Sequence, residues 1–283
     1  MTQPAVSKPS SYVYFPAHQG KVASGVCVTS SHRSLGSSTF IIHLIHTFSQ
    51  KRKSNLKLKC YFHNGWKNPR LLIQPIKSEE LCDSPHVVRF YDVLSDRDSE
   101  EIIRLAAPLM FRSGVTGDDG AINDNPMERV GKNAWLDNSP VVNNFMTRVA
   151  DITGLNVGAE IYLQVANYGI GGHFDPHIDE TGGYENIMER RIATFLTYFS
   201  DVEYGGNTPF VYQEVVAEPI KGSAIFWYDV FNDGSADERT EHAACPVVLG
   251  NKWAGNLWLT FGDQTFTKQC PLNNKTPREY RIF

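Results

Sequence analysis

The stretch "NYGIGGHFDPHIDETGG", residues 167–183, contains two overlapping copies of the pattern His-x-Asp. The first copy is His173 with Asp175, and the second is His177 with Asp179. Two residues that stand two apart on an extended chain point to the same side of it, so either pair can offer two ligands to one metal ion. The third ligand must then come from elsewhere in the chain.

The other histidines are the candidates for this third ligand. They are His18, His32, His43, His46, His63, His86 and His242. Only His242 lies in the second half of the chain, where short strands are predicted. Two histidines and one carboxylate that leave coordination positions open form the facial triad of non-haem Fe(II) oxygenases. Zinc accepts similar ligands, so the triad alone does not identify the metal.

Lys252 indicates which kind of compound could bind beside the metal. It stands ten residues after His242, across the turn "LGNK". If the two residues face each other on paired strands, a positive charge lies beside the metal, where a metal-bound 2-oxo acid would need it for its distal carboxylate. Further candidates for hydrogen-bond donors or pocket walls fall on predicted strands or at their ends: Tyr168, Tyr198, Thr208 and Trp258.

The composition is that of an ordinary globular chain. Its 283 residues can bury a substantial core, and 41% are hydrophobic and 20% charged. The net charge of −4 comes with no basic or acidic tail, so nothing indicates binding to nucleic acid or to a membrane surface. No apolar run reaches the roughly 18 residues of a membrane helix. The five cysteines form no zinc pattern, and their odd number leaves at least one without a partner in the chain.

The chain divides into three stretches of different pattern. Residues 1–55 are rich in serine without periodicity, and we predict a poorly ordered extension followed by one domain over residues 56–283. Residues 94–110 and 139–155 predict helices, capped by Ser95 and Ser139. Short strands are then predicted over 159–169, 190–200, 208–216, 222–230, 239–248 and 252–262. Helices followed by strands with glycine-rich turns indicate an α+β fold, in which helices buttress a sandwich or barrel.

Four stretches resemble the catalytic region of the collagen prolyl 4-hydroxylase α subunits. They are "LQVANYGIGGHFDPHID", "RRIATFLTYFSDVEYGGNTPF", "KGSAIFWYDVF" and "EHAACPVVLGNKWAGNLW". The resemblance runs from about Cys60 to Cys270, roughly three quarters of the chain. It implies a double-stranded β-helix, or jelly roll, that uses Fe(II), 2-oxoglutarate and ascorbate to hydroxylate peptidyl proline at C4.

The resemblance also selects between the two His-x-Asp copies. The family's segment has two glycines, three variable residues and then Pro-His-x-Asp, which places the iron ligands at His177 and Asp179, with His242 as the third. By the same register, His173 and Asp175 fall on variable positions. Lys252 would bind 2-oxoglutarate. Four further residues match family positions that contact this co-substrate or line its pocket: Tyr168, Tyr198, Thr208 and Trp258.

The substrate implied by the resemblance is a proline-rich, collagen-like peptide with X-Pro-Gly repeats. Such segments are extended polyproline II chains, so a groove beside the iron should accept one. Residues 179–191 are a candidate rim or lid for this groove. Two alternatives remain: a 2-oxoglutarate oxygenase with another protein or small-molecule substrate, or a peptide-binding subunit without turnover.

The cysteines are expected to follow the family in part. Cys245 and Cys270 match a family disulfide, and we predict Cα atoms within about 7 Å of each other. Cys60 matches half of a second bridge, whose usual partner position is His43. The cysteines that could replace that partner are Cys27 and Cys82.

The family works in the endoplasmic reticulum lumen, with protein disulfide isomerase as its β subunit. We therefore expect a secretory gene product, although the sequence shows no secretory signal. The apolar run of residues 40–48 precedes its basic residues rather than following them. The sequence also has no room for the long N-terminal dimerisation and peptide-binding regions of full-length α subunits.

Overall fold

The computed structural model describes residues 60–64, 68–116, 122–123, 127–158, 161–180, 187–213, 215–268 and 279–282. It also describes one short strand pair, β1 (Tyr12–Val13) and β2 (Cys27–Val28). The rest of the predicted extension lies outside these ranges, so the domain boundary near residue 56 stays a prediction.

The larger of two facing sheets has nine antiparallel strands. In spatial order they are β3 (Cys60–His63), β4 (Ile76–Cys82), β5 (Val87–Phe90), β17 (Ala224–Tyr228), β13 (Arg191–Tyr198), β20 (Lys252–Thr260), β11 (Leu163–Tyr168), β10 (Lys132–Leu136) and β6 (Phe111–Arg112). Its central strand β13 pairs with β17 on one side and with β20 on the other.

The smaller sheet has five strands. They are β16 (Val215–Ala217), β15 (Thr208–Phe210), β18 (His242–Ala244), β12 (His173–His177) and β9 (Arg129–Val130). Two further pairs are β14 (Tyr204–Gly205) with β19 (Val247–Leu249), and β7 (Val115–Thr116) with β8 (Ile122–Asn123). Side chains of both sheets form one buried cluster between them: Val87, Leu196, Tyr198, Phe210, Val215, Ala217, Ile225, Trp227 and Ala254. This sandwich confirms the predicted jelly-roll core.

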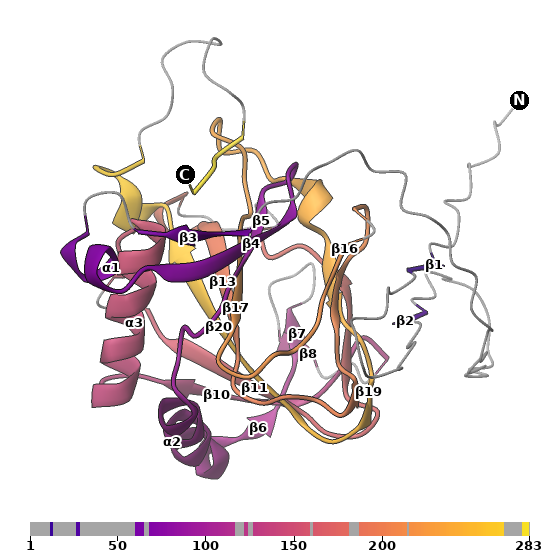
Figure 1. Ribbon diagram of the computed structural model, residues 1–283. Coiled ribbons are helices and arrows are strands. Elements are labelled where there is room, and N and C mark those ends of the chain that lie inside the picture. The colour runs from indigo at the N-terminus through magenta and orange to yellow at the C-terminus, as the bar shows by residue number, and fades with distance from the viewer. Residues whose placement is uncertain are drawn as a thin grey trace, which may run out of the picture.

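Three helices cover the outer face of the large sheet (Figure 1). They are α1 (Pro69–Ile73), α2 (Asp96–Ala106) and α3 (Pro140–Thr153). The predicted caps are confirmed, because Ser95 Oγ accepts the Asp98 N–H at 3.1 Å and Ser139 Oγ accepts the Val142 N–H at 3.3 Å. A second buried cluster joins α2 and α3 to the sheet, so the helices buttress it as expected.

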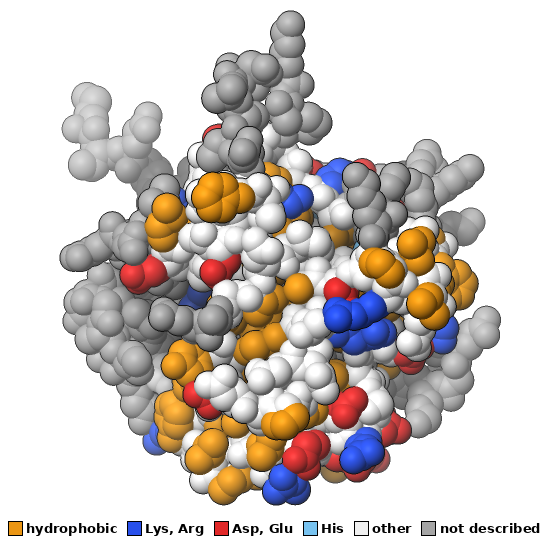
Figure 2. All heavy atoms as spheres, turned by 90° about the vertical axis from the view of Figure 1, so that its left-hand side faces the viewer, with side chains coloured by type: hydrophobic (Ala, Val, Ile, Leu, Met, Phe, Trp, Pro, Cys, Tyr) orange, Lys and Arg blue, Asp and Glu red, His pale blue; other side chains and the backbone are white. Residues whose placement is uncertain are grey.

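On the side that carries these helices, the described residues form no continuous patch of one charge (Figure 2). Figure 2 shows lysines and arginines interspersed with acidic and apolar side chains on this face. In the part of the chain that the structure describes, no helix is long and apolar enough to cross a membrane.

The strand predictions were wrong in three details. Residues 208–216 form a hairpin of two strands, β15 and β16, rather than one strand. Residues 239–248 also divide, because Pro246 cannot donate to a ladder, and β18 and β19 belong to different sheets. Strand β12 was not predicted as a strand at all, since glycines precede it and Pro176 interrupts it.

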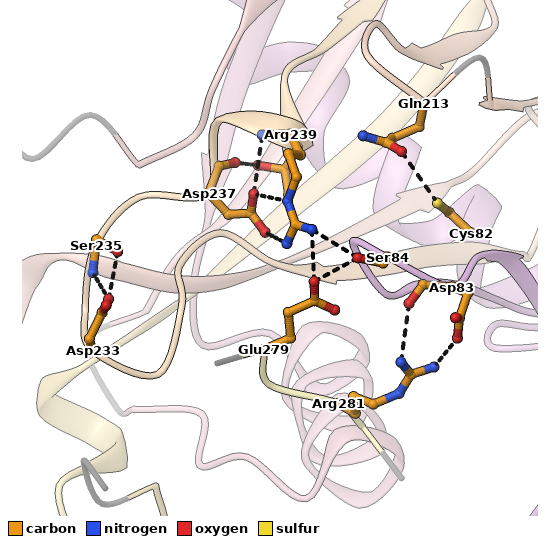
Figure 3. Close-up of polar contacts among 11 residues, drawn as sticks. Cys82, Asp83, Ser84, Gln213, Asp233, Ser235, Asp237, Arg239, Glu279 and Arg281 are labelled. Carbon is orange, nitrogen blue, oxygen red and sulfur yellow. Dashed lines mark hydrogen bonds and ion pairs between the residues drawn. The ribbon is translucent and has the colours of Figure 1, made fainter. Parts of the chain in front are cut away.

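Residues 279–282 are attached to the domain by ion pairs (Figure 3). Arg239 Nη1 lies 2.7 Å from Glu279 Oε1, and the same carboxylate oxygen accepts the Ser84 hydroxyl at 2.6 Å. Arg281 forms a second pair with Asp83. Glu279 and Arg281 therefore hold the C-terminal residues against the turn that follows β4, which contains Asp83 and Ser84.

Arg239→Ala is expected to lower the free energy of unfolding by about 2–3 kcal/mol. Asp237 is 4% exposed, and Arg239 Nη2 lies 2.6 Å from its carboxylate, so the variant leaves a buried charge without its partner. Urea unfolding measures the change. Arg281→Ala is the control, because Arg281 and Asp83 are both more than one third exposed and their pair should contribute less than about 1 kcal/mol. Equal losses of unfolding free energy in Arg239→Ala and Arg281→Ala would contradict the prediction that the Arg239 pair contributes more.

Candidate metal centre

A glycine turn places the ligand strand β12. Gly171 has φ +78°, a conformation that favours glycine, and its N–H donates to Val247 O at 2.8 Å. After this turn β12 pairs with β18, and His177 stands directly opposite His242. Cross-strand neighbours lie close together on one face of a sheet, so two residues 65 positions apart in the sequence meet there.

Asp179 completes the group. One ligand atom from each of His177, Asp179 and His242 lies within 4.8 Å of the others. Asp179 Oδ1 is 3.6 Å from His177 Nε2, and Asp179 Oδ2 is 4.0 Å from His242 Nε2. Within the described ranges, this is the one group of three such side chains that could hold a metal ion.

Both histidines are oriented by backbone carbonyl groups. His177 Nδ1 lies 2.8 Å from Asp175 O, and His242 Nδ1 lies 3.0 Å from Thr240 O. A carbonyl oxygen only accepts, so each Nδ1 carries the hydrogen and each Nε2 keeps its lone pair for a metal.

Asp179 is oriented through one of its two oxygens. Its Oδ2 accepts the Thr194 hydroxyl at 2.7 Å and the Trp258 indole N–H at 3.0 Å. No described hydrogen bond occupies Oδ1, which faces His177 Nε2. The carboxylate therefore presents one oxygen to a metal while two donors hold the other.

The protonation states also suit a divalent cation. Burial, and then the positive charge that His242 could carry, lower the pKa of His177 to about 3. Burial alone would raise the pKa of Asp179, but His242, His177 and Arg191 outweigh it and hold it at about 2. A neutral imidazole and a carboxylate are the forms that bind metal at neutral pH, so this donor set fits Fe(II).

Lys252 lies at the start of β20 among three of the predicted side chains. It is 2% exposed, and its ammonium group donates to Thr208 Oγ1 at 3.3 Å. The Tyr168 and Tyr198 rings lie 5.8 and 5.6 Å from it, and the Tyr198 hydroxyl donates to Thr208 at 2.9 Å. Among the described residues, no carboxylate pairs with this buried lysine.

The expected arrangement of His242 and Lys252 on paired strands was wrong. His242 belongs to the small sheet, on β18, and Lys252 to the large sheet, on β20. The His242 ring contacts Phe210 and Trp227, two members of the cluster between the sheets. The sandwich therefore brings the two residues to facing sheets, a relation that their short separation in the sequence does not reveal.

The first His-x-Asp copy is not part of the ligand group. His173 Nδ1 bonds back to Gly171 O at 3.0 Å, and the Asp175 N–H donates to Glu128 O at 2.8 Å. Burial raises the pKa of Asp175, so its environment does not favour the ionised form that a metal ligand needs.

Sequence reasoning missed three residues beside the ligands. Thr194 donates to Asp179, Arg191 donates to the Asp179 carbonyl at 2.9 Å, and Trp135 lies 5.9 Å from Trp258 between ring centroids. For Thr194, the only available indication was a polar residue inside the apolar run "RIATFLTY". Arg191 and Trp135 gave none, because charged and aromatic residues are common at strand ends.

The cysteine predictions have mixed outcomes. Cys245 is in a disulfide, but its predicted partner Cys270 lies outside the described residues, so that pairing stays a prediction. Cys60 does not form the second bridge with either candidate partner, Cys27 or Cys82, because Cys60 is a free thiol, as is Cys82. Cys27 and His43 have no described side chains.

Residues 163–260 match the family model of the 2OG-Fe(II) oxygenase superfamily. This matched region of the chain runs from β11 to the end of β20, and it is the part that resembles the superfamily. The crystal structure of the viral collagen prolyl hydroxylase of Paramecium Bursaria Chlorella virus-1, a 2OG complex, has the same fold. Its TM-score is 0.50 at 22% identity, over 61% of this chain and 94% of that one.

Within the superfamily, the predicted resemblance to prolyl 4-hydroxylase α subunits is confirmed. The chain is 44% identical over 220 residues to prolyl 4-hydroxylase subunit alpha-2 of Gallus gallus, and 40% identical over 225 residues to subunit alpha-1 of Homo sapiens. These matches cover 76% and 77% of this chain but only 41% and 42% of those proteins. The chain thus spans less than half the length of the curated relatives that it matches.

Proposed function

We propose that the chain is an Fe(II)- and 2-oxoglutarate-dependent dioxygenase that hydroxylates peptidyl proline at C4. One oxygen atom of O₂ enters the proline C4–H bond as a hydroxyl group. The other enters succinate, which forms with CO₂ from 2-oxoglutarate. The bound iron would supply the activation of O₂, and ascorbate would return oxidised iron to Fe(II).

The observation that carries this proposal is the buried ammonium group of Lys252, which has no carboxylate partner among the described residues and lies in the same sandwich as the ligand group. An isolated buried cation is costly, so such a residue indicates an anionic ligand that completes it. 2-Oxoglutarate has a chelating 2-oxo acid at one end and a carboxylate at the other. It can therefore bind the metal and the lysine at once.

Each predicted residue then has a separate task. His177, Asp179 and His242 would hold the iron and leave positions open for 2-oxoglutarate and O₂. Lys252 and the Thr208 hydroxyl would bind the distal carboxylate, with the Tyr168 and Tyr198 rings as walls that exclude water. Trp258 would act on the metal side, since its indole N–H donates to Asp179.

The proposed substrate is a proline-rich or collagen-like peptide. Trp135 is 43% exposed and lies against Trp258, whose ring the Arg191 guanidinium covers at 3.9 Å. Aromatic surfaces are the usual partners of polyproline II segments. This surface adjoins the iron ligand Asp179, so a proline packed on it would lie beside the metal. Residues 179–191 remain the proposed rim, although 181–186 lie outside the described residues.

We also propose the endoplasmic reticulum lumen as the compartment and protein disulfide isomerase as the β subunit. Similarity to animal α subunits and the disulfide of Cys245 support both proposals. Co-purification of the isomerase with a tagged chain, and retention of that chain in the lumen, would test them.

Peptide hydroxylation tests the proposed reaction. The purified chain is incubated with Fe(II), 2-oxoglutarate, ascorbate and either a (Pro-Pro-Gly) repeat or a matched proline-free peptide, and both products are measured. We expect 4-hydroxyproline by mass spectrometry and equimolar succinate with the first peptide only. Succinate without peptide hydroxylation would indicate another substrate. The absence of both products, also with the isomerase present, would indicate a binding subunit.

The affinity for 2-oxoglutarate is expected to fall as the pH rises above about 7. Burial lowers the pKa of Lys252 to about 7 in the free protein, and the bound carboxylate would raise it. Below pH 7 the lysine is already charged. Above pH 7 binding must take up one proton, so the dissociation constant should rise about tenfold per pH unit. Anaerobic calorimetry between pH 6 and 9 measures this, and Lys252→Arg, which stays charged, should remove the slope. A flat profile in the unmodified protein would contradict it.

A further inference from the structure

Two buried carboxyl groups share one hydroxyl group behind the metal centre. Thr194 Oγ1 lies 2.7 Å from Asp179 Oδ2 and 2.9 Å from Asp229 Oδ2. Thr194 is fully buried, Asp229 is 2% exposed and Asp179 is 7% exposed. A threonine hydroxyl has a single hydrogen and can donate it to one acceptor only. One of the two carboxyl groups must therefore carry a proton and donate it to the threonine oxygen.

The surroundings decide which carboxyl group is protonated. Asp179 Oδ2 already accepts the Trp258 N–H, and the Arg191 guanidinium lies against the Asp179 backbone. Asp229 Oδ1 is buried without a hydrogen-bond partner in the described part of the chain. Arg191 and Trp227 favour the ionised form of Asp229, but its burial and the charge of Asp179 outweigh them. Burial, and then the negative charge of Asp179, raise the pKa of Asp229 well above its ordinary value. Asp229 is the neutral acid, and Asp179 is the anion.

The strand register holds this arrangement in place. Thr194 stands directly opposite Trp258 on the paired strands β13 and β20, so both donors to Asp179 Oδ2 come from adjacent positions. Asp229 follows β17 immediately, where its N–H donates to Ile192 O at 2.9 Å and its carbonyl accepts the Asp237 N–H at 2.9 Å. The backbone on both sides of Asp229 is thereby fixed beneath Thr194.

We propose that Asp229 is a positioning residue of the metal site, which acts through Thr194. Its neutral carboxyl group donates to Thr194 Oγ1, which directs the threonine hydrogen to Asp179 Oδ2. That oxygen is then held by two donors, and Oδ1 remains for the metal. The inference rests on the metal site proposed above, and hydrogen-bond partners of this kind typically contribute 10–100-fold to metal affinity, as an order of magnitude.

Metal binding by the full chain tests the proposal without turnover. The dissociation constant for Co(II) is measured from its visible absorption, and that for Fe(II) by anaerobic competition. Thr194→Val and Asp229→Leu remove one donor each at similar volume, and both should raise the dissociation constant about 10–100-fold. Thr194→Ser and Asp229→Asn keep a donor at the same place and should retain most of the affinity.

Thr197→Val is the matched control. Thr197 lies on the same strand and is fully buried, and its Oγ1 has no hydrogen-bond partner among the described residues, but it stands on the opposite face from Thr194. The variant loses a buried threonine hydroxyl in the same element and should bind Co(II) like the unmodified chain. Infrared difference spectra of the unmodified chain against Asp229→Asn should show one protonated carboxyl group that the variant lacks.

The outcomes separate this proposal from the metal site itself. If Asp179→Ala abolishes Co(II) binding while Thr194→Val leaves it unchanged, the site is correct and the role of Asp229 is refuted. If Asp179→Ala binds Co(II) normally, the proposed metal site is wrong. A loss in Asp229→Asn as large as that in Asp229→Leu would show that the charge matters, not the donated hydrogen. That result would overturn the inference, as would an infrared spectrum without the protonated group.

Discussion

His177→Ala and Asp179→Ala are each expected to reduce peptide hydroxylation by more than about 100-fold, since residues that merely orient metal ligands already cost about 10–100-fold. Each variant removes one of three donors whose atoms lie within 4.8 Å of one another. His177 contributes an Nε2 that its Asp175 carbonyl bond leaves free, and Asp179 contributes the only carboxylate of the group. The assay is mass spectrometry of the peptide, with bound Fe(II) quantified in parallel.

The overlapping motif supplies the controls for this experiment. His173→Ala and Asp175→Ala change the same residue types two and four positions away from the ligands, on the same strand and its end. Both should retain most of the activity and iron, because neither side chain belongs to the ligand group. A folded but inactive His173→Ala, together with an active His177→Ala, would show that the first copy holds the metal.

Local patterns in the sequence were sufficient to predict the helices and to propose candidate ligands. Ser95 and Ser139 cap α2 and α3 because capping depends on residues within one turn. The ligand pair His177 and Asp179 was likewise within one short motif. His242 could be proposed as the third ligand because few histidines fall in the strand-rich half of the chain.

Relations between strands could not be obtained in this way. The pairing of β12 with β18 and of β13 with β20 joins segments more than 55 positions apart, and no periodicity encodes that register. The sandwich therefore had to be seen before Thr194, Trp258 and Asp229 could be connected to Asp179. His242 and Lys252 were wrongly expected on paired strands for the same reason. The residues between them do not show whether the chain forms a hairpin or crosses from one sheet to the other.

Lys252→Ala is expected to weaken 2-oxoglutarate binding by about 100-fold or more, because truncation of one member of a buried charge pair costs about 2–5 kcal/mol. Lys252 is 2% exposed, and Thr208 is its only described hydrogen-bond acceptor. The distal carboxylate would lose its counter-charge in a place that water does not reach. Lys252→Arg keeps the charge with a different length and shape, and should restore only part of the affinity.

Lys268→Ala is the matched control for Lys252→Ala. The Lys268 ammonium group also lies over two tyrosine rings, 5.6 Å from Tyr228 and 5.8 Å from Tyr280, and burial lowers its pKa as well. This variant removes a partly buried lysine that also lies beside two tyrosine rings, but away from the proposed co-substrate site. Its affinity for 2-oxoglutarate, measured by anaerobic calorimetry with Fe(II), should not change.

A comparison of two 2-oxo acids assigns the effect to the distal carboxylate rather than to a general disturbance. 2-Oxobutyrate has the chelating end of 2-oxoglutarate but no second carboxylate. The unmodified protein should prefer 2-oxoglutarate by about 100-fold or more, by the same cost of an unpaired buried charge. In Lys252→Ala this preference should nearly disappear, because 2-oxobutyrate never used the lysine. If the variant weakened both acids equally, Lys252 would support the metal end of the site or the fold, and not the carboxylate.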